Sequence, residues 1–220
     1  PSGYVDLICE EMIPAVAEEN LAEYCDVFCE RGYFSVKDTR KILETAMHYN
    51  IKPRLHADEF VDSGATALAA ELGAASADHL MAVSDIGIHA IAEKGVIATL
   101  LPGTTLFLGK GNYAPGRKII DSGCEVALAT DYNPGSCTLQ SMPMIISLAN
   151  LYCGLTIEEA FKAATWNGAR AIDRGNKIGA VCEGYEADLL LWEMSSIDEI
   201  PYWMGSDHIL NVIKKGKLLE

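Results

Sequence analysis

Five short strand-like runs recur through the first two thirds of the chain, spaced by about 20 to 30 residues. They cover residues 25–30, 53–58, 75–80, 96–101 and 126–130. Patterns typical of amphipathic helices fill the intervals, and this alternation is the spacing of successive βαβ units. The chain is therefore expected to belong to the α/β class, with a parallel sheet covered by helices.

Residues that typically begin or end helices mark the expected ends of the intervening helices. Ser35, followed by Asp38, resembles the start of a capping box, and Ser84 can cap a later helix. Gly73 and Gly95 stand where helices are expected to stop, because glycine readily adopts the left-handed conformation that ends a helix. Each predicted helix thus ends just before the next predicted strand.

The regular alternation of strand and helix patterns ends after the fifth run. Helices are predicted over 142–151 and 157–166, the second after the capping pattern Thr156-x-x-Glu159. A β-rich tail follows, with pieces over 179–192 and a hairpin over 209–219. We expect a small second β-layer attached to the α/β body.

Five consecutive βα units fit either an open doubly wound sheet or part of an eight-stranded barrel. A nucleotide-binding open sheet would be expected to carry a GxGxxG fingerprint after a strand, and the chain has none. Gly103, Gly109 and Gly111 are too irregularly spaced to hold a phosphate, and we interpret them as a loop. The pattern favours the barrel.

The charge balance argues against nucleic acid as a partner. The formal net charge is −14, from 17 Lys+Arg against 31 Asp+Glu, which leaves no basic patch for a phosphate backbone. No apolar run reaches the roughly 18 residues of a membrane span, so no membrane partner is expected. Seven scattered cysteines without a CxxC pair fit a reducing cytoplasm.

Groups able to bind metal or move protons gather where three of the predicted strands end. They are His56, Asp58 and Glu59 at the end of the second run, Asp78 and His79 at the end of the third, and Asp131 after the fifth. Taken singly, each is more often structural, and Asp131 could simply shape the turn that follows it. Because the carboxyl ends of barrel strands face one rim, their recurrence predicts a site there.

The donors in this set are too few for a complete metal site. His56 and Asp131 are two plausible ligands with His79 as a proton shuttle, whereas a hydrolytic zinc or iron site needs three or four protein ligands. We expect His48, His89 and His208 to be structural, because two lie in helical patterns and one in the β-rich tail.

The segments RLHADEF, ELGAASADHL and ALATDYNPGS resemble the imidazolonepropionases, a family of the metal-dependent amidohydrolase superfamily. The resemblance covers essentially the whole chain. It implies a partial (β/α)8 barrel, about strands 4 to 8, over residues 1–175, followed by β-strands of a composite β-sandwich over 176–220.

Carried over residue by residue, the resemblance implies roles for seven positions. It implies that His56 and Asp131 bind one zinc or iron ion per subunit. It implies that Glu59, His79 and Asp131 are catalytic. The substrate-binding residues that it implies are Glu59, Asn133, Gly135 and Ser136.

The implied reaction is hydrolysis of 4-imidazolone-5-propanoate to N-formimidoyl-L-glutamate, a step of histidine degradation, by a metal-activated water. The substrate is a small molecule and the enzyme a cytoplasmic homodimer. The family's His-x-His ligand pair is absent from this chain, which does not begin with Met. We therefore expect a fragment that lacks the N-terminal part, binds metal incompletely and is inactive alone.

Other readings stay open. Another amidohydrolase, such as a cytosine or guanine deaminase, would share the barrel and the metal chemistry. A metal-free fragment, in which the rim residues pair among themselves, belongs to a different class. A Schiff-base barrel enzyme is disfavoured, because Lys52, at the start of one strand, is the nearest lysine to any strand run.

Overall fold

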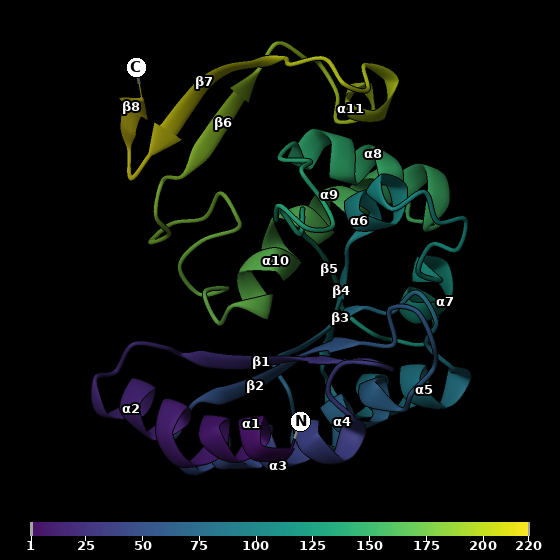
Figure 1. Ribbon diagram of the computed structural model, residues 1–220. Coiled ribbons are helices and arrows are strands. Elements are labelled where there is room, and N and C mark those ends of the chain that lie inside the picture. The colour runs from purple at the N-terminus through teal and green to yellow at the C-terminus, as the bar shows by residue number, and fades with distance from the viewer. Residues whose placement is uncertain (1, 220) are drawn as a thin grey trace. The chain divides into compact units, whose positions relative to one another are not determined.

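The alternation of strands and helices is present in the computed structural model, which describes residues 2–219; Pro1 and Glu220 lie outside the described residues (Figure 1). The chain divides into two units. The first comprises Pro1–Thr99 and Lys118–Glu125, and the second Leu100–Arg117 and Val126–Glu220.

The main sheet has the strand order β1-β2-β3-β4-β5, the same as the order along the chain. Its strands β1 to β4 pair in parallel. The five strands overlap all five predicted strand runs, so the predicted α/β class is confirmed. They are β1 (Tyr24–Cys29), β2 (Lys52–Ala57), β3 (Ser76–His79), β4 (Ile97–Leu100) and β5 (Val126–Leu128).

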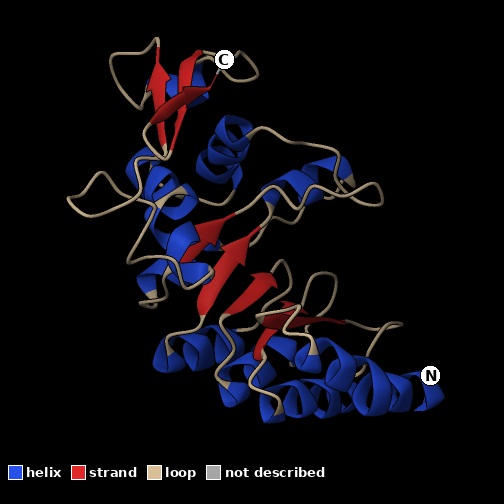
Figure 2. Cartoon of the chain, turned by 90° about the vertical axis from the view of Figure 1, so that its left-hand side faces the viewer, coloured by secondary structure: helices blue, strands red, loops and turns tan. Residues whose placement is uncertain are grey.

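Helices of the first unit cover one face of its strands. Figure 1 shows α3 (Val36–His48) and α4 (Ala65–Leu72) along β1 and β2, and Figure 2 shows helices in blue beneath the strands next to the N-terminus. The remaining helices of this part are α1 (Ser2–Leu7), the π-helix η1 (Ile8–Met12), α2 (Ile13–Glu18), α5 (Asp85–Lys94) and α7 (Gly116–Asp121), of which α7 contributes residues to both units.

The predicted caps are in place. The Ser35 hydroxyl accepts a hydrogen bond from the backbone N–H of Asp38, and the Ser84 hydroxyl accepts one from a backbone N–H in the first turn of α5. Gly73 and Gly95 end α4 and α5 with φ of 60° and 67°. These left-handed conformations carry little strain in glycine, which explains why the helices stop there.

The two faces of the first unit's strands differ in polarity, because successive side chains of a strand point to opposite sides. Val27, Cys29, Leu55 and Ala57 are buried on the face that packs against α3 and α4. The residues that alternate with them are polar except for Phe28. Register pairs Asp26 with Arg54 and His56 with Asp78, so these four side chains share the other face.

The second unit combines helices with a separate small sheet. Strands β6 (Leu189–Trp192), β7 (Ile209–Lys214) and β8 (Lys217–Leu219) pair antiparallel in that order, which confirms the predicted β-rich tail. The predicted hairpin turns at Gly216, whose φ is 75°. The helices are α6 (Pro102–Phe107), α8 (Met142–Tyr152), α9 (Ile157–Ala164), α10 (Trp166–Ala171) and α11 (Glu199–Tyr202).

Three local predictions were wrong. The helix over 157–166 ends at Ala164, because Thr165 leaves the helical region at φ −117° and ψ −86° before α10 begins. Gly103 lies in α6 and not in a loop; a Cβ there would lie 2.7 Å from Ile145 Cδ1, so glycine permits close packing of α6. Strand structure within 179–192 is confined to β6, because the preceding residues form turns.

Among residues 2–219, no helix is both long enough and apolar enough to cross a membrane.

Candidate active-site residues

His56 lies near the carboxyl end of β2, on the polar face. Its Nδ1 lies 3.1 Å from Oδ1 and 3.0 Å from Oδ2 of Asp26 on β1. Asp26, His56 and Asp78 each offer a ligand atom, and these atoms all lie within 4.8 Å of one another. The first unit therefore contains a candidate His/Asp metal cluster, and Asp26 is a member that the sequence reading missed.

Asp78 is buried on the same face, 8% exposed. Burial raises the pKa of its carboxyl, because loss of water disfavours the charged form, while the Arg54 guanidinium opposes this shift. Arg54 Nε lies 4.0 Å from Asp78 Oδ2 and donates a 2.9 Å hydrogen bond to Ser76 Oγ. The surroundings of Asp78 thus include one cation on the neighbouring strand.

Asp58, the first carboxylate of the HADEF segment, is a structural anchor. It is fully buried, and its oxygens accept hydrogen bonds from the backbone N–H groups of Ser63, Ala65 and Thr66 and from the Thr66 hydroxyl. These contacts satisfy the donors at the start of α4. Asp58 therefore ties the loop after β2 to α4.

Glu59, the next residue, faces His79. His79 Nε2 lies 3.8 Å from Glu59 Oε2, and their side chains are 2% and 5% exposed. Burial lowers the pKa of His79 to about 3, with the neighbouring His56 adding to the shift and Asp26 opposing it. His79 is thus a neutral imidazole at neutral pH, able to donate from one ring nitrogen and accept at the other.

Glu30, directly after β1, holds the loop that carries Glu59. Its Oε2 accepts hydrogen bonds from the backbone N–H groups of Phe60 at 2.8 Å and Val61 at 3.4 Å, and its Oε1 accepts one from Arg31 at 2.7 Å. Glu30 is only 3% exposed. The sequence reading missed this residue, although it is a carboxylate at a strand end like those that were singled out.

Asp131 belongs to the second unit and follows β5. The hydroxyl of the buried Thr104, on α6, donates a 2.5 Å hydrogen bond to Asp131 Oδ2. Asp58, His79 and Asp131 all have positive φ, at 48°, 76° and 52°. Such conformations are uncommon outside glycine and cluster at functional sites, so the chain turns sharply at three of the predicted rim positions.

The loop after Asp131 brings together three of the four predicted substrate-binding residues. Asn133 Oδ1 accepts from the backbone N–H groups of Gly135 and Ser136, each at 2.8 Å. Asn133 Nδ2 donates to the Asp131 carbonyl at 2.8 Å and to Ser136 Oγ at 2.9 Å. The Asn133 side chain therefore shapes the loop, a role that its residue type alone did not reveal.

Two further histidines and two cysteines lie outside the residues described above. His48 and His89 lie on α3 and α5, as expected. Burial raises the pKa of Cys25 to about 11 and that of Cys153 to about 12, so these thiols are poor nucleophiles at neutral pH.

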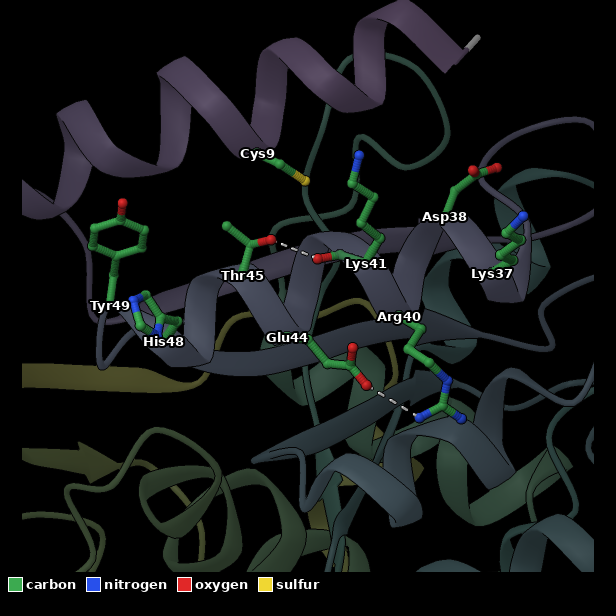
Figure 3. Close-up of a pocket in the computed structure, with 9 residues that line it drawn as sticks. All are labelled: Cys9, Lys37, Asp38, Arg40, Lys41, Glu44, Thr45, His48 and Tyr49. Carbon is green, nitrogen blue, oxygen red and sulfur yellow. Dashed lines mark hydrogen bonds and ion pairs between the residues drawn. The ribbon is translucent and has the colours of Figure 1, made fainter.

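A surface groove of about 660 Å³ lies along α3 (Figure 3). Two of its basic side chains, Arg40 and Lys41, form ion pairs with Glu44 and Asp6. It holds none of the predicted site residues.

The curated relatives point to one enzyme. Over 219 residues the chain is 48% identical to an imidazolonepropionase of Alkaliphilus oremlandii, covering 100% of this chain and 52% of that protein. It is 50% identical over 216 residues to an imidazolonepropionase of Clostridium tetani, covering 98% and 51%. The chain spans about half the length of the curated relatives it matches.

Solved structures agree on the fold. A Xaa-Pro dipeptidase with bound methionine in the active site matches with a TM-score of 0.77 at 18% identity, covering 96% of this chain and 58% of that chain. The A. niger ochratoxinase gives 0.76 at 22%, covering 96% and 54%. A zinc-bound adenosine deaminase from Xanthomonas campestris gives 0.71 at 21%, covering 84% and 49%.

These likenesses confirm the predicted fold class, a partial barrel of the amidohydrolase type with a small C-terminal β-sheet. The profile of the amidohydrolase family matches residues 29–219, which is most of the sequence. The chain belongs to the amidohydrolase family.

Proposed function

We propose that this chain is part of an imidazolonepropionase, which hydrolyses 4-imidazolone-5-propanoate to N-formimidoyl-L-glutamate. The observation that carries the proposal is 48% identity to an imidazolonepropionase along 219 residues. The candidate residues His56, Glu59 and His79 lie together in the first unit, which supports a hydrolytic role. Because the chain spans about half of these relatives, the activity is proposed for the whole protein.

We propose that His56 and Asp131 bind the metal, one zinc or iron ion per subunit. An imidazole nitrogen and a carboxylate oxygen suit either ion. The first unit fits this role, because His56 Nδ1 is bonded to Asp26 and the other ring nitrogen can serve as ligand. When bound, such an ion acts as a Lewis acid and lowers the pKa of a water. The further ligands that a three- or four-ligand site needs would come from the rest of the protein.

Residues of this chain would then transfer protons and stabilise the charge that develops on the substrate. In this proposal Asp131 accepts a proton from the attacking water, with its other contact, the Thr104 hydroxyl, fixing the carboxylate. His79, a neutral imidazole in a buried setting, donates a hydrogen bond to the lactam carbonyl oxygen as charge develops there. Glu59 binds a ring nitrogen or carries the proton to the leaving nitrogen as the C–N bond breaks.

The loop of Asn133, Gly135 and Ser136 would hold the substrate. Asn133 already has both polar side-chain atoms engaged within the loop. We therefore assign substrate contact chiefly to backbone groups that Asn133 holds in place. This division lets a small polar substrate bind a rigid loop with little loss of conformational entropy.

Three further features of the whole protein complete the proposal. Residues 1–175 would contribute to the barrel and 176–220 to a composite β-sandwich. The enzyme would be a homodimer and would work in the cytoplasm.

A substrate panel on the complete parent protein, purified with zinc or iron, tests the assignment. Loss of the imidazolone and appearance of N-formimidoyl-glutamate are expected, with no ammonia released from cytosine, guanine or adenosine. Ammonia release without imidazolone turnover would establish a deaminase instead. Absence of turnover on every substrate with no bound metal would support the metal-free reading.

A further inference from the structure

We propose that Asp26 is a positioning residue for His56: its carboxylate holds the imidazole with the proton on Nδ1, so that Nε2 is the nitrogen whose lone pair can bind a metal. The consequence for metal rests on the proposed function of His56. The tautomer of His56 does not depend on that proposal, so the tautomer and the metal binding can be tested separately.

The contact arises from strand register. On parallel strands β1 and β2, Asp26 is paired with Arg54 and Phe28 with His56. Asp26 therefore lies diagonally across from His56 on the same face. Both carboxylate oxygens lie close to Nδ1, at 3.1 and 3.0 Å. Register and face together bring the acceptor to one particular ring nitrogen.

The chemistry of the pair fixes the proton. A carboxylate can only accept hydrogen bonds, whereas a neutral imidazole has one N–H donor and one lone pair. The short contact to Asp26 is therefore made by Nδ1–H, which leaves the lone pair of His56 on Nε2. A carboxylate bonded to the far nitrogen of a ligating histidine sets its tautomer and raises its basicity.

Neighbouring rings restrict the orientation of His56. The Phe28 ring meets the His56 ring edge-on with centroids 5.8 Å apart. On another side the His79 ring lies 5.2 Å away at an interplanar angle of 47°. Packing against these two rings therefore limits rotation of the His56 imidazole. The hydrogen bond to Asp26 keeps Nδ1 directed towards β1.

Asp78 is a second carboxylate near His56. Its contacts distinguish it from Asp26 as the partner of Nδ1. Asp78 Oδ2 lies 4.0 Å from Arg54 Nε, and the Asp78 side chain is 11% exposed against 37% for Asp26. The carboxylate within hydrogen-bond distance of Nδ1 is that of Asp26.

Nitrogen-15 spectra of the labelled 220-residue chain, recorded without metal at a pH where imidazoles are neutral, report the tautomer of each of its five histidines. His56→Gln identifies the His56 signals. We expect His56 protonated at Nδ1. In Asp26→Leu, which has a similar branched shape and no acceptor, the population should reverse towards Nε2–H. Asp26→Asn, which keeps one acceptor oxygen, should retain part of the Nδ1–H form.

Asp85→Asn is the matched control, because it removes the same charge from an exposed site on α5 and should leave the His56 signals unchanged. A wild-type His56 protonated at Nε2 would overturn the proposal, even if Asp26→Leu failed to fold. An Asp26→Leu chain that folds and keeps the Nδ1–H form would overturn it as well.

Addition of zinc alone to the complete parent protein, labelled in the same way, separates this inference from the proposed metal site. A zinc-dependent shift of Nε2 supports both. An Nδ1–H tautomer that zinc does not perturb supports the role of Asp26 and counts against the metal assignment. A zinc-dependent shift of Nδ1 overturns the inference. In the complete parent protein, Asp26→Leu should weaken zinc binding about 10- to 100-fold, as loss of such a partner does elsewhere.

Discussion

The carboxylate of Glu30 and the backbone N–H of Phe60 are joined by a 2.8 Å hydrogen bond, which ties the end of β1 to the loop after β2. Asp58 anchors the same loop to the start of α4. Glu59 lies between these two anchored residues. Its position opposite His79 is therefore fixed from both sides by buried carboxylates that the proposed chemistry does not itself use.

Replacement of Glu30 by Ala should destabilise the fold. The N–H groups of Arg31, Phe60 and Val61 would lose their acceptor, which is itself buried, and the loss of these partly buried hydrogen bonds should cost about 1 to 3 kcal/mol. Urea denaturation measures the free energy of unfolding. Glu11→Ala, at an exposed position of η1, is the control and should change it by less than about 0.5 kcal/mol. Equal effects of the two variants would contradict an anchoring role.

The sequence predicted the candidate site residues better than it predicted the residues that hold them in place. His56, Glu59 and His79 stand at strand ends in a recognisable pattern, and the structure brings these three together. Asp26 was not found, because its contact depends on the register between β1 and β2, which the pattern of apolar residues does not specify.

The fold was likewise predicted where it depends on local sequence and missed where it depends on contacts between distant residues. The five strands and the caps at Ser35 and Ser84 were predicted, because they depend on local periodicity and on side chains three residues apart. The short helix α6 was missed, because Gly103 and its neighbours have low helix propensity and the helix depends on packing against residues distant in the sequence.

Asp58→Ala should cost more than Glu30→Ala. Asp58 accepts from three backbone N–H groups and two hydroxyls at the start of α4, so its removal combines the loss of a cap with unpaired buried donors. We expect a loss of about 2 to 4 kcal/mol in the free energy of unfolding. Asp62→Ala, in the same loop but at an exposed carboxylate, should cost less than about 1 kcal/mol. A reversed order would refute the anchor.

The ion pair of Arg117 with Glu159 should make stability depend on pH in the acid range. Hydrogen bonding to Arg117 lowers the pKa of Glu159 below its ordinary 4.5, so the unfolded state takes up a proton first as pH falls. The contribution of Glu159 is present above its unfolded pKa and is lost as pH falls through its folded pKa.

The measurement for this pair is thermal unfolding of wild type and Glu159→Gln at several pH values. The difference between them should be largest near neutral pH and should vanish in acid. Glu158→Gln is the matched control, because it removes a carboxylate from the same first turn of α9 without the contact to Arg117. A difference that stays constant with pH would exclude the linkage.

Asn133→Ala should loosen the loop after Asp131. The N–H groups of Gly135 and Ser136 lose their acceptor, so their amide hydrogens should exchange at least about tenfold faster. Asn133→Asp keeps that acceptor and should preserve protection. Tyr132→Phe, at the exposed neighbouring position, is the control. In the complete protein we expect Asn133→Ala to raise KM more than it lowers kcat, and unchanged exchange would remove the basis for this expectation.

His79→Ala in the complete protein should lower turnover of the imidazolone by about 100-fold or more, the range typical of a lost proton donor. Bound metal, measured by elemental analysis, should remain, because His79 is assigned beside the carbonyl oxygen and not to the ligand set. His48→Ala, at an exposed position of α3, controls for removal of a histidine and should turn over normally. Because His79 is 2% exposed, His79→Gln keeps a polar group there and guards against a loss caused by misfolding. Normal turnover by a folded His79→Ala enzyme would show that the neutral imidazole facing Glu59 serves the structure alone.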